Sequence, residues 1–311
     1  MLKSFRFLVI VTLAVGLFAV ERPQGWQVSQ RFTGVTYSER SDSAPRPIRM
    51  HVAQIDLQAP GIRVKVSPHG GDREVFRQST LDFLSQERAQ LAINGHFFLP
   101  FPSDDKTAWV IGLGASEGQV FSAFEIPEQN YALTAFAPAL NIDRENHASI
   151  VHYDPAFPDG RHVKENVQLW NVVAGSSQIV TDGAVTIPAY RDDNHFDAEL
   201  DPGGPNNYSN AKAWSDATTA RTAIGLSRDR RTLTLFTIDV RGGSEGMKLS
   251  EVAALLIRDF GVADALNLDG GGSTSMAMED ANGTPTLVNT SSDRPSGRVV
   301  ATSLAVFARR R

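Results

Sequence analysis

The stretch ALNLDGGGSTSM at residues 265–276 is the part of the chain that most strongly decides its fold and its site. Its first four residues are mostly apolar, which predicts a short buried β-strand that ends at Asp269. Three successive glycines then leave the backbone bare, and such a turn can direct N–H groups at an anion. We predict an anion-binding loop with an acid beside it, formed by Gly270, Gly271, Gly272, Ser273 and Thr274. The alternative is an ordinary tight turn.

Composition predicts a globular protein with one large domain or two modest ones. The chain has 311 residues, of which 41% are hydrophobic and 21% charged. A net charge of −5 without a long basic run argues against nucleic acid as a partner, and the terminal residues 309–311 are expected to be a frayed, solvated tail. The absence of cysteine excludes disulfides, thiolate nucleophiles and thiolate metal sites.

The N-terminus predicts export. Lys3 and Arg6 precede an apolar run at residues 7–20, which suits a secretory signal peptide and is too short to span a bilayer. We expect residues 1–20 to be a signal peptide and the protein to be secreted or periplasmic. An uncleaved N-terminal anchor is the alternative, and it would be the one point of membrane contact.

Residues 21–47 form a polar lead-in, and residues 48–308 are predicted to form one domain. Alternating apolar residues at 48–52 and 62–66 predict a hairpin, and Ser79 is expected to cap a helix that runs to about Arg88. Further strands are expected at 91–93, within 130–140 and within 167–174.

The second half of the chain also predicts strands, a long loop and a helix. The polar stretch 187–220 is expected to be a long functional loop, and a hairpin follows at 222–240. Ser250 is expected to cap a helix that Gly261 ends, and Leu304 and Val306 are expected to pair into the main sheet. These elements predict an α+β fold: a single domain on a mixed, largely antiparallel β-sheet with a few packed helices.

Six segments in a fixed order carry a family resemblance. They are NGHFF at 94–98, AGSSQIVTDGAV at 174–185, RTAIGLSRD at 221–229, IDVRGGSEGMKLSEVAALL at 238–256, ALNLDGGGSTSM at 265–276 and VNTSSDRPSGRVVATSLAVFA at 288–308. In this order they resemble the phosphodiester glycosidase family over about residues 48–308. The chain departs from the family at His96, where a glycine is usual, at Ala220, where a proline is usual, and in the turn at 175–177.

The resemblance implies an exported glycoside hydrolase that cleaves the bond between a sugar anomeric carbon and phosphate. Its substrate would be a sugar-1-phosphodiester or a cell-envelope polysaccharide. The leaving phosphate monoester is weakly basic, so the main needs are to bind the anion and to stabilise an oxocarbenium-like transition state. Asp269 is our first choice for the catalytic carboxylate, as nucleophile, base or electrostatic stabiliser, and Asp239 is the second.

Arg221 is predicted to bind phosphate, and Asn94, His96 and Asn267 are predicted to bind substrate together with the loop. Three of these residues have a structural alternative. Arg221 could pair with Asp239 or Asp269, His96 could be a packed core histidine, and Asn267 could satisfy backbone groups beside the turn.

Metal use stays open. The oxygen atoms of Asp239, Asn267 and Asp269 would suit calcium or magnesium, but no cofactor is predicted. A serine hydrolase with Ser273 as nucleophile is disfavoured because the chain lacks the strand–turn–helix elbow of that class. The remaining rival is a non-catalytic phosphoglycan-binding protein of the cell envelope, which would use the same site.

Overall fold

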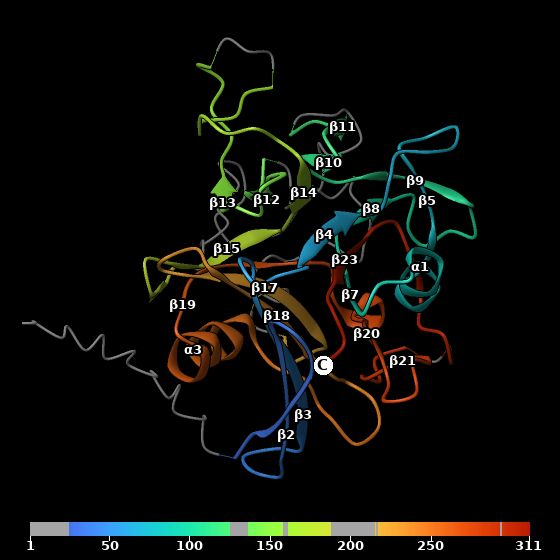
Figure 1. Cartoon of the computed structure of the whole chain (residues 1–311), viewed down its shortest axis with the longest axis vertical. Helices are drawn as coiled ribbons and strands as arrows, with labels where there is room; N and C mark the ends of the chain where they lie inside the picture. The colour runs from blue at the N-terminus through green and yellow to red at the C-terminus, as the bar shows by residue number, and fades with distance from the viewer. Residues whose placement is uncertain (1–24, 125–135, 158–160, 188–214, 216, 293) are drawn as a thin grey trace, which may run out of the picture.

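The computed structural model describes residues 25–124, 136–157, 161–187, 215, 217–292 and 294–311 (Figure 1). Strands dominate these residues, and their pairings in the three large sheets are antiparallel. The α+β, largely antiparallel fold is therefore confirmed. Within the described part of the chain, no helix is both long and apolar enough to cross a membrane.

The largest sheet has eight strands and supplies one wall of the site. Its order is β1 (Gln27–Phe32), β2 (Val35–Asp42), β3 (Ile48–Asp56), β18 (Thr232–Ile238), β17 (Arg221–Ser227), β19 (Val262–Asn267), β15 (Ser177–Thr181) and β16 (Ala184–Val185). Both faces of its central strands are apolar. Ala53 and Leu235 enter one core, and their neighbours Val52 and Phe236 enter another on the opposite face.

Two five-stranded sheets pack against the inner face of this sheet. One has the order β21 (Pro285–Leu287), β20 (Met276–Glu279), β7 (Leu91–Asn94), β23 (Ser303–Phe307) and β4 (Arg63–Val66). The other has the order β11 (Gln119–Ser122), β10 (Gly114–Ser116), β14 (Asn171–Ala174), β12 (Ala139–Ile142) and β13 (Ala148–Val151). Side chains of all three sheets share one hydrophobic cluster, which makes the described residues one layered domain.

Two small sheets complete the wall beside the site. They pair β22 (Val299–Val300) with β6 (Gln78–Ser79), and β5 (Val75–Phe76) and β8 (Phe98–Leu99) with β9 (Thr107–Val110). Both meet around the apolar cluster that contains Phe98 and Val300, with Phe101 packed against it. Phe101 and Val300 thereby tie the neighbouring segments to this cluster.

Each helix covers the outer face of a sheet. Helix α3 (Leu249–Phe260) packs on the eight-stranded sheet, and α1 (Thr80–Glu87) packs on the sheet that contains β7 (Figure 1). The predicted cap of α1 is confirmed, because Ser79 Oγ accepts from Asp82 N at 3.0 Å. The start predicted for α3 is wrong: Lys248 occupies the cap and its N–H donates to Glu251 Oε2 at 2.8 Å, so Ser250 lies inside the helix.

Strand partners were harder to predict than strands. The hairpin predicted for 48–52 and 62–66 does not form, since β3 pairs with β2 and β18 whereas β4 pairs with β23. Strand β23 pairs with β4 and β7 in a five-stranded sheet, not in the main one. The hairpin of β17 and β18 is confirmed, and so is Gly261 as the left-handed residue that ends α3.

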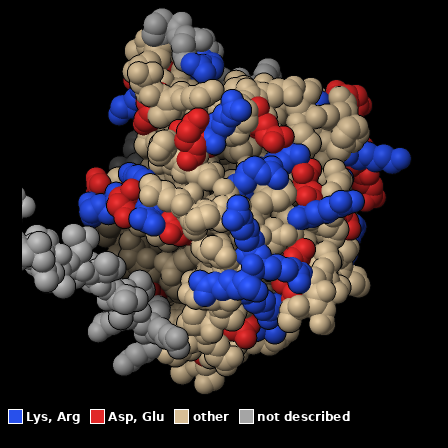
Figure 2. All heavy atoms as spheres, in the orientation of Figure 1, with Lys and Arg blue, Asp and Glu red and all other residues tan. Residues whose placement is uncertain are grey.

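The first described strands and the C-terminus lie at the large sheet. Residues 27–42 of the predicted lead-in form β1 and β2 at its edge. The C-terminal arginines are exposed, but they are not a frayed tail, because Arg311 N donates to Arg31 O at 3.1 Å and Arg310 pairs with Glu279 at 2.9 Å. Figure 2 shows basic side chains gathered over the surface where Figure 1 places the C-terminus.

The predicted signal peptide at 1–20 and most of the loop expected at 187–220 lie outside the described residues. The same holds for residues 130–135 of the strand expected within 130–140. Of the remaining strand predictions, 91–93 corresponds to β7, and β12 and β14 begin at Ala139 and Asn171.

Candidate active site

The glycine loop is the crossing between two sheets. Strand β19 of the eight-stranded sheet ends at Asn267, the short helix η3 (Gly271–Ser273) follows, and β20 then enters the sheet that contains β7. Asn94, at the end of β7, reaches across this crossing. Its Nδ2 donates to the main-chain oxygen of Asp269 at 2.7 Å, and its Oδ1 accepts from Thr222 Oγ1 and Ser275 N. Asn94 thus fixes the loop relative to both sheets.

The loop is tighter than an open anion nest. The amides of Gly270, Gly271, Ser273 and Thr274 all donate to protein oxygens at 2.8–3.2 Å. Gly272 holds the remaining loop amide. The glycines are needed because of close approach: a Cβ on Gly270 would lie 2.9 Å from Ala220 O, and one on Gly272 would collide with the Arg298 guanidinium. The main role of the loop is therefore to hold Asp269 close to Arg298, not to present main-chain amides to a ligand.

Asp269 has the properties of a working carboxyl group. It follows Leu268 after the end of β19, the residue is mostly but not fully buried, and its Oδ1 accepts from Gly270 N at 2.8 Å. Crowding by protein atoms raises the pKa of the carboxyl to about 7, although Ser273, the charge of Arg298 and the Gly270 amide pull that pKa downward. A carboxyl that solvent can reach and that titrates near neutrality is suited to proton transfer.

Arg298 was not singled out from the sequence, although it lies in the last family segment. Its Nη1 donates to Ser273 Oγ at 3.3 Å, and its guanidinium carbon lies 5.1 Å from the centroid of the Phe101 ring. Arg298 also lines a cavity of about 520 Å³. The cavity wall is formed by Arg77, Phe101, Pro102, Ser103, Asp104, Asp105, Ser292, Arg294, Arg298 and Val299. Arg298 therefore connects Asp269 with a pocket that has several cationic side chains.

Arg221 lies at the edge of the loop but is turned inward. It is 2% exposed, its Nε donates to Met247 O at 3.1 Å, and its Nη2 donates to Ala217 O at 2.6 Å. Burial lowers its pKa to about 10. These contacts with main-chain oxygens favour a structural role, which differs from both the phosphate contact and the ion pair considered from the sequence.

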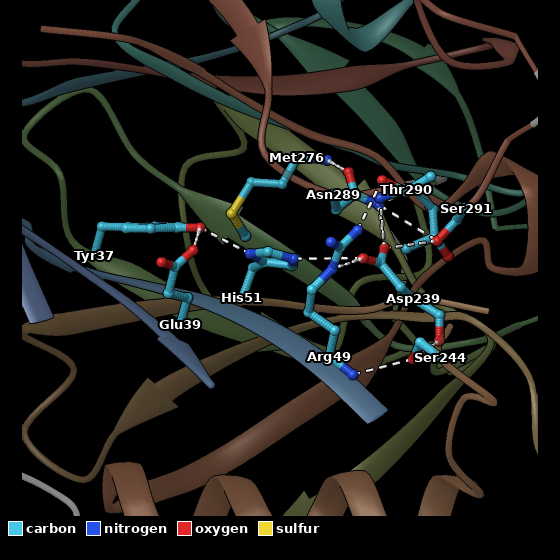
Figure 3. A network of polar contacts seen from close by, with 11 residues as sticks. Tyr37, Glu39, Arg49, His51, Asp239, Ser244, Met276, Asn289, Thr290 and Ser291 are labelled. Atoms are coloured by element: carbon cyan, nitrogen blue, oxygen red, sulfur yellow. Dashed lines mark hydrogen bonds and ion pairs between the residues drawn. The ribbon is translucent and has the colours of Figure 1, made fainter. Parts of the chain in front are cut away.

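Asp239 is the centre of a buried polar network (Figure 3). Its Oδ2 lies 2.9 Å from Arg49 Nε and 3.4 Å from His51 Nε2. Its Oδ1 accepts from Asn289 Nδ2, Thr290 N and Ser291 Oγ at 2.7–3.1 Å. Burial would raise its pKa, but the bonds from His51, Thr290 and Arg49 outweigh that effect and the pKa lies below the usual value. With both oxygens occupied, Asp239 is better suited to positioning than to chemistry.

The network reaches the loop through Asn289. This side chain donates to Thr274 O at 3.0 Å and accepts from Met276 N at 2.7 Å, while it also donates to Asp239 (Figure 3). On the other side, His51 Nδ1 lies 2.7 Å from the Tyr37 hydroxyl. The end of β18 is thereby connected to the segment that leaves the loop.

His96 is a packed histidine in this structure. It is fully buried, its Nδ1 lies 2.8 Å from Thr302 Oγ1, and its Nε2 lies within 3.1 Å of Ala174 N and Leu113 O. Burial lowers its pKa to about 4, so the ring is neutral at physiological pH. This geometry favours the structural alternative for His96.

The side-chain nitrogen of Asn267 is hydrogen-bonded, whereas its side-chain oxygen has no partner among the described residues. Its Nδ2 donates to Ser176 Oγ at 3.0 Å and to Leu268 O at 2.8 Å. Its buried Oδ1, like the buried Thr274 Oγ1, has no hydrogen-bond partner among the described residues. Metal binding gains no support, because Asp239 is saturated by donors and the described part of the chain holds no cluster of three or more His, Cys, Asp or Glu side chains suited to an ion.

In this antiparallel fold, a carboxyl group whose pKa is raised to about 7 thus lies near a pocket that is lined by arginines. The sequence matches the family model "Phosphodiester glycosidase" over residues 87–307, which is well over half of the chain. The protein belongs to the phosphodiester glycosidase family. The family resemblance seen in the sequence is thus confirmed, whereas no curated protein matches the chain.

Solved structures show the same fold at low sequence identity. The catalytic domain of zebrafish N-acetylglucosamine-1-phosphodiester alpha-N-acetylglucosaminidase, auto-inhibited by its pro-peptide, is 19% identical with a TM-score of 0.57, covering 92% of this chain and 89% of that one. A hypothetical protein from Synechocystis is 15% identical with a TM-score of 0.62, covering 92% and 68%. An exported protein from Burkholderia pseudomallei, described as putative, is 17% identical with a TM-score of 0.53, covering 86% and 75%.

Proposed function

We propose that this protein is an exported phosphodiester glycosidase that hydrolyses the bond between the anomeric carbon of a sugar and a phosphodiester oxygen. The single observation that carries the proposal is that Asp269, whose pKa is raised to about 7, lies within the electrostatic influence of Arg298, which bonds to Ser273 and lines the pocket. Family membership and the zebrafish neighbour support the reaction class. The signal-like residues 1–20 support export, and a cell-envelope glycan is the substrate we infer from that location.

The phosphate would be bound by Arg298, with Ser273 and the Gly272 amide nearby. A guanidinium binds phosphate oxygens through paired charge-assisted hydrogen bonds, and these strengthen as negative charge grows on the departing oxygen. In this arrangement Arg298 replaces Arg221 as the phosphate ligand, because Nε and Nη2 of Arg221 donate to main-chain oxygens.

Asp269 would act as the general base. The C1–O bond to phosphate breaks and its electron pair leaves with the phosphate monoester, a water oxygen bonds to C1, and the water proton passes to the Asp269 carboxylate. A phosphate monoester needs little protonation to leave, so a second carboxyl acting as acid is unnecessary. Asp239, with both oxygens occupied, is not placed to serve as one. One-step attack by water predicts inversion at C1.

The test is sugar release from a panel of sugar-1-phosphodiesters by wild type, Asp269→Asn and Arg298→Gln, with NMR of the first anomer formed. We expect release by wild type, inversion at C1, and a loss of at least about 100-fold in each variant, as is common for general-base and charge-stabilising groups. Retention would contradict the general-base role. Binding of phosphoglycans without turnover of any substrate would instead support the non-catalytic alternative.

A further inference from the structure

The pocket that begins at Arg298 contains two more arginines that the proposed reaction does not use. Arg77, at the end of β5, and Arg294, in the segment before β22, both line the same cavity of about 520 Å³. Their positive charges interact. The pKa of Arg77 lies below the usual value, first because of burial, while Asp105 and Asp104 oppose the shift and Arg294 and Arg298 add to it. Like charges gathered in one cavity attract an anion.

Arg77 is held in place before any ligand arrives. Its Nη1 donates to Ser103 O at 2.8 Å and to Asp105 O at 3.1 Å, and its Nη2 donates to Val299 O at 3.3 Å. The guanidinium carbon lies 4.9 Å from the centroid of the Phe98 ring. Its buried Nε has no hydrogen-bond partner among the described residues. The group is thus rigid, and its hydrogen-bonding capacity is not exhausted.

Two aspartates also line the pocket, but they do not cancel the three arginines. Asp105 pairs with Arg73 Nη1 at 2.9 Å, so its charge is balanced by a residue that does not line the cavity. Asp104 is exposed at the rim. Arg294 is exposed as well, which leaves its side chain accessible to a ligand that enters from solvent.

The groups are arranged in an order that assigns a direction to the substrate. Asp269 is connected to Ser273, Ser273 to Arg298, and Arg298 to the cavity that Arg77 and Arg294 line. If the anomeric carbon faces Asp269 and the scissile phosphate faces Arg298, the alcohol esterified to that phosphate extends towards Arg77 and Arg294.

We propose that Arg77 and Arg294 form a second anion subsite, which binds a further phosphate group on the alcohol side of the scissile phosphodiester. This inference rests on the proposed function, because that function places the first phosphate at Arg298. It identifies the substrate class as a sugar-1-phosphodiester whose leaving group is itself phosphorylated. The second phosphate either belongs to the next phosphodiester of a polymer, so that a phosphorylated alcohol leaves as its phosphate monoester, or takes the place of the alcohol in a pyrophosphate, so that a pyrophosphate leaves.

Binding without turnover tests the subsite. Isothermal titration calorimetry would compare inorganic phosphate, pyrophosphate and 1,3-propanediol bisphosphate on wild type, Arg294→Gln, Arg298→Gln and the control Arg228→Gln. Arg228 is a good control because its side chain is 73% exposed on the β17–β18 turn. Its replacement by glutamine removes the same charge as Arg294→Gln. We expect wild type to prefer one two-phosphate probe over phosphate by about tenfold or more, as one added charge-assisted contact would give. The preferred probe then identifies the pyrophosphate or the polymer source.

Arg294→Gln should abolish this preference, while its affinity for inorganic phosphate stays within about threefold of wild type. A threefold change corresponds to a free energy well below that of one charge-assisted contact. Arg298→Gln should weaken both kinds of probe, and Arg228→Gln should resemble wild type. The subsite is refuted if wild type shows no preference, if Arg294→Gln keeps it, or if Arg228→Gln loses it equally. A preference lost in Arg294→Gln together with a failed turnover panel would retain the subsite and reject the glycosidase reaction.

Discussion

Asn94 and Asp269 lie 175 positions apart in the chain, yet the Asn94 Nδ2 donates to the Asp269 main-chain oxygen at 2.7 Å. The bond joins the end of β7 to the end of β19, and Asp269 N returns a bond to Gly95 O at 3.1 Å. The position of the catalytic candidate therefore depends on the packing of two sheets, not on the glycine loop alone.

Replacement of Asn94 by alanine should destabilise the protein and reduce turnover together. The change leaves Thr222 Oγ1, Ser275 N and Asp269 O without their partner, and each such buried group costs about 1–3 kcal/mol. We expect a loss of at least about 2 kcal/mol in urea unfolding, against less than about 0.5 kcal/mol for the exposed control Gln30→Ala. Equal effects of the two variants would show that Asn94 does not hold the crossing.

The raised pKa of Asp269 predicts how stability and activity depend on pH. Because the pKa of about 7 in the folded state exceeds the ordinary aspartate value of 3.8, the folded state binds more protons than the unfolded state between these pH values. The contribution of this group to stability is therefore complete below about pH 4 and is lost as pH rises through about 7. In Asp269→Asn that loss should disappear from urea unfolding measured between pH 4 and pH 8.

Activity should follow the opposite direction. A general base must be ionised, so kcat/KM should rise with pH and level off above an apparent pKa near 7. His96 cannot cause this increase of kcat/KM near pH 7, since its pKa is about 4. A profile that falls between pH 6 and pH 8 would mean that the protonated carboxyl is the active form and that Asp269 is an acid.

Asp239→Asn should act on stability and on the position of the loop. The change removes the charge that faces Arg49 and His51, and because the Arg49 side chain is 36% exposed and screened by solvent, we expect a cost of about 1–3 kcal/mol. We expect a loss in this range in urea unfolding at pH 7. Since the folded pKa of Asp239 is depressed, its contribution is present above the unfolded value and is lost as pH falls below about 4.

A kinetic comparison separates positioning from chemistry at Asp239. A positioning residue that acts through Asn289 should alter kcat without moving the pH limb assigned to Asp269, and Arg49→Gln should reproduce part of the effect. If Asp239→Asn abolished the limb itself, Asp239 would be a titrating catalytic group after all.

The sequence predicted individual strands and helices better than their partners, because single elements depend on local information. Alternating apolar residues identified β3, β17 and β18, and the hydroxyl and glycine signals located the ends of both helices to within about two residues. Strand partners are decided by non-local packing, so the pairing of β4 with β23 could not be deduced from the short link between β3 and β4.

Side-chain direction explains the remaining differences in the site. Arg221 and Arg298 are both single arginines at strand ends, and nothing in their neighbours shows which one turns inward. In the fold, Arg221 is enclosed by the segments around Ala217 and Met247, whereas Arg298 lies over Gly272 and faces the pocket. Arg294 and Arg298 lie in one segment, but Arg77 comes from a distant part of the chain, so no local motif contains all three arginines of that pocket.

This contrast between the two arginines leads to a direct comparison of Arg298→Gln with Arg221→Met. Loss of Arg298 should weaken competitive inhibition by inorganic phosphate about tenfold or more, because a charge-assisted contact is removed. Arg221→Met removes the charge-assisted hydrogen bonds to Met247 O and Ala217 O, so it should lower the free energy of unfolding by about 1–3 kcal/mol while the inhibition constant for phosphate stays within about threefold. Steady-state inhibition and urea unfolding measure the two effects separately. The reverse pattern, in which Arg221→Met abolishes phosphate inhibition and Arg298→Gln leaves it intact, would return the phosphate contact to Arg221.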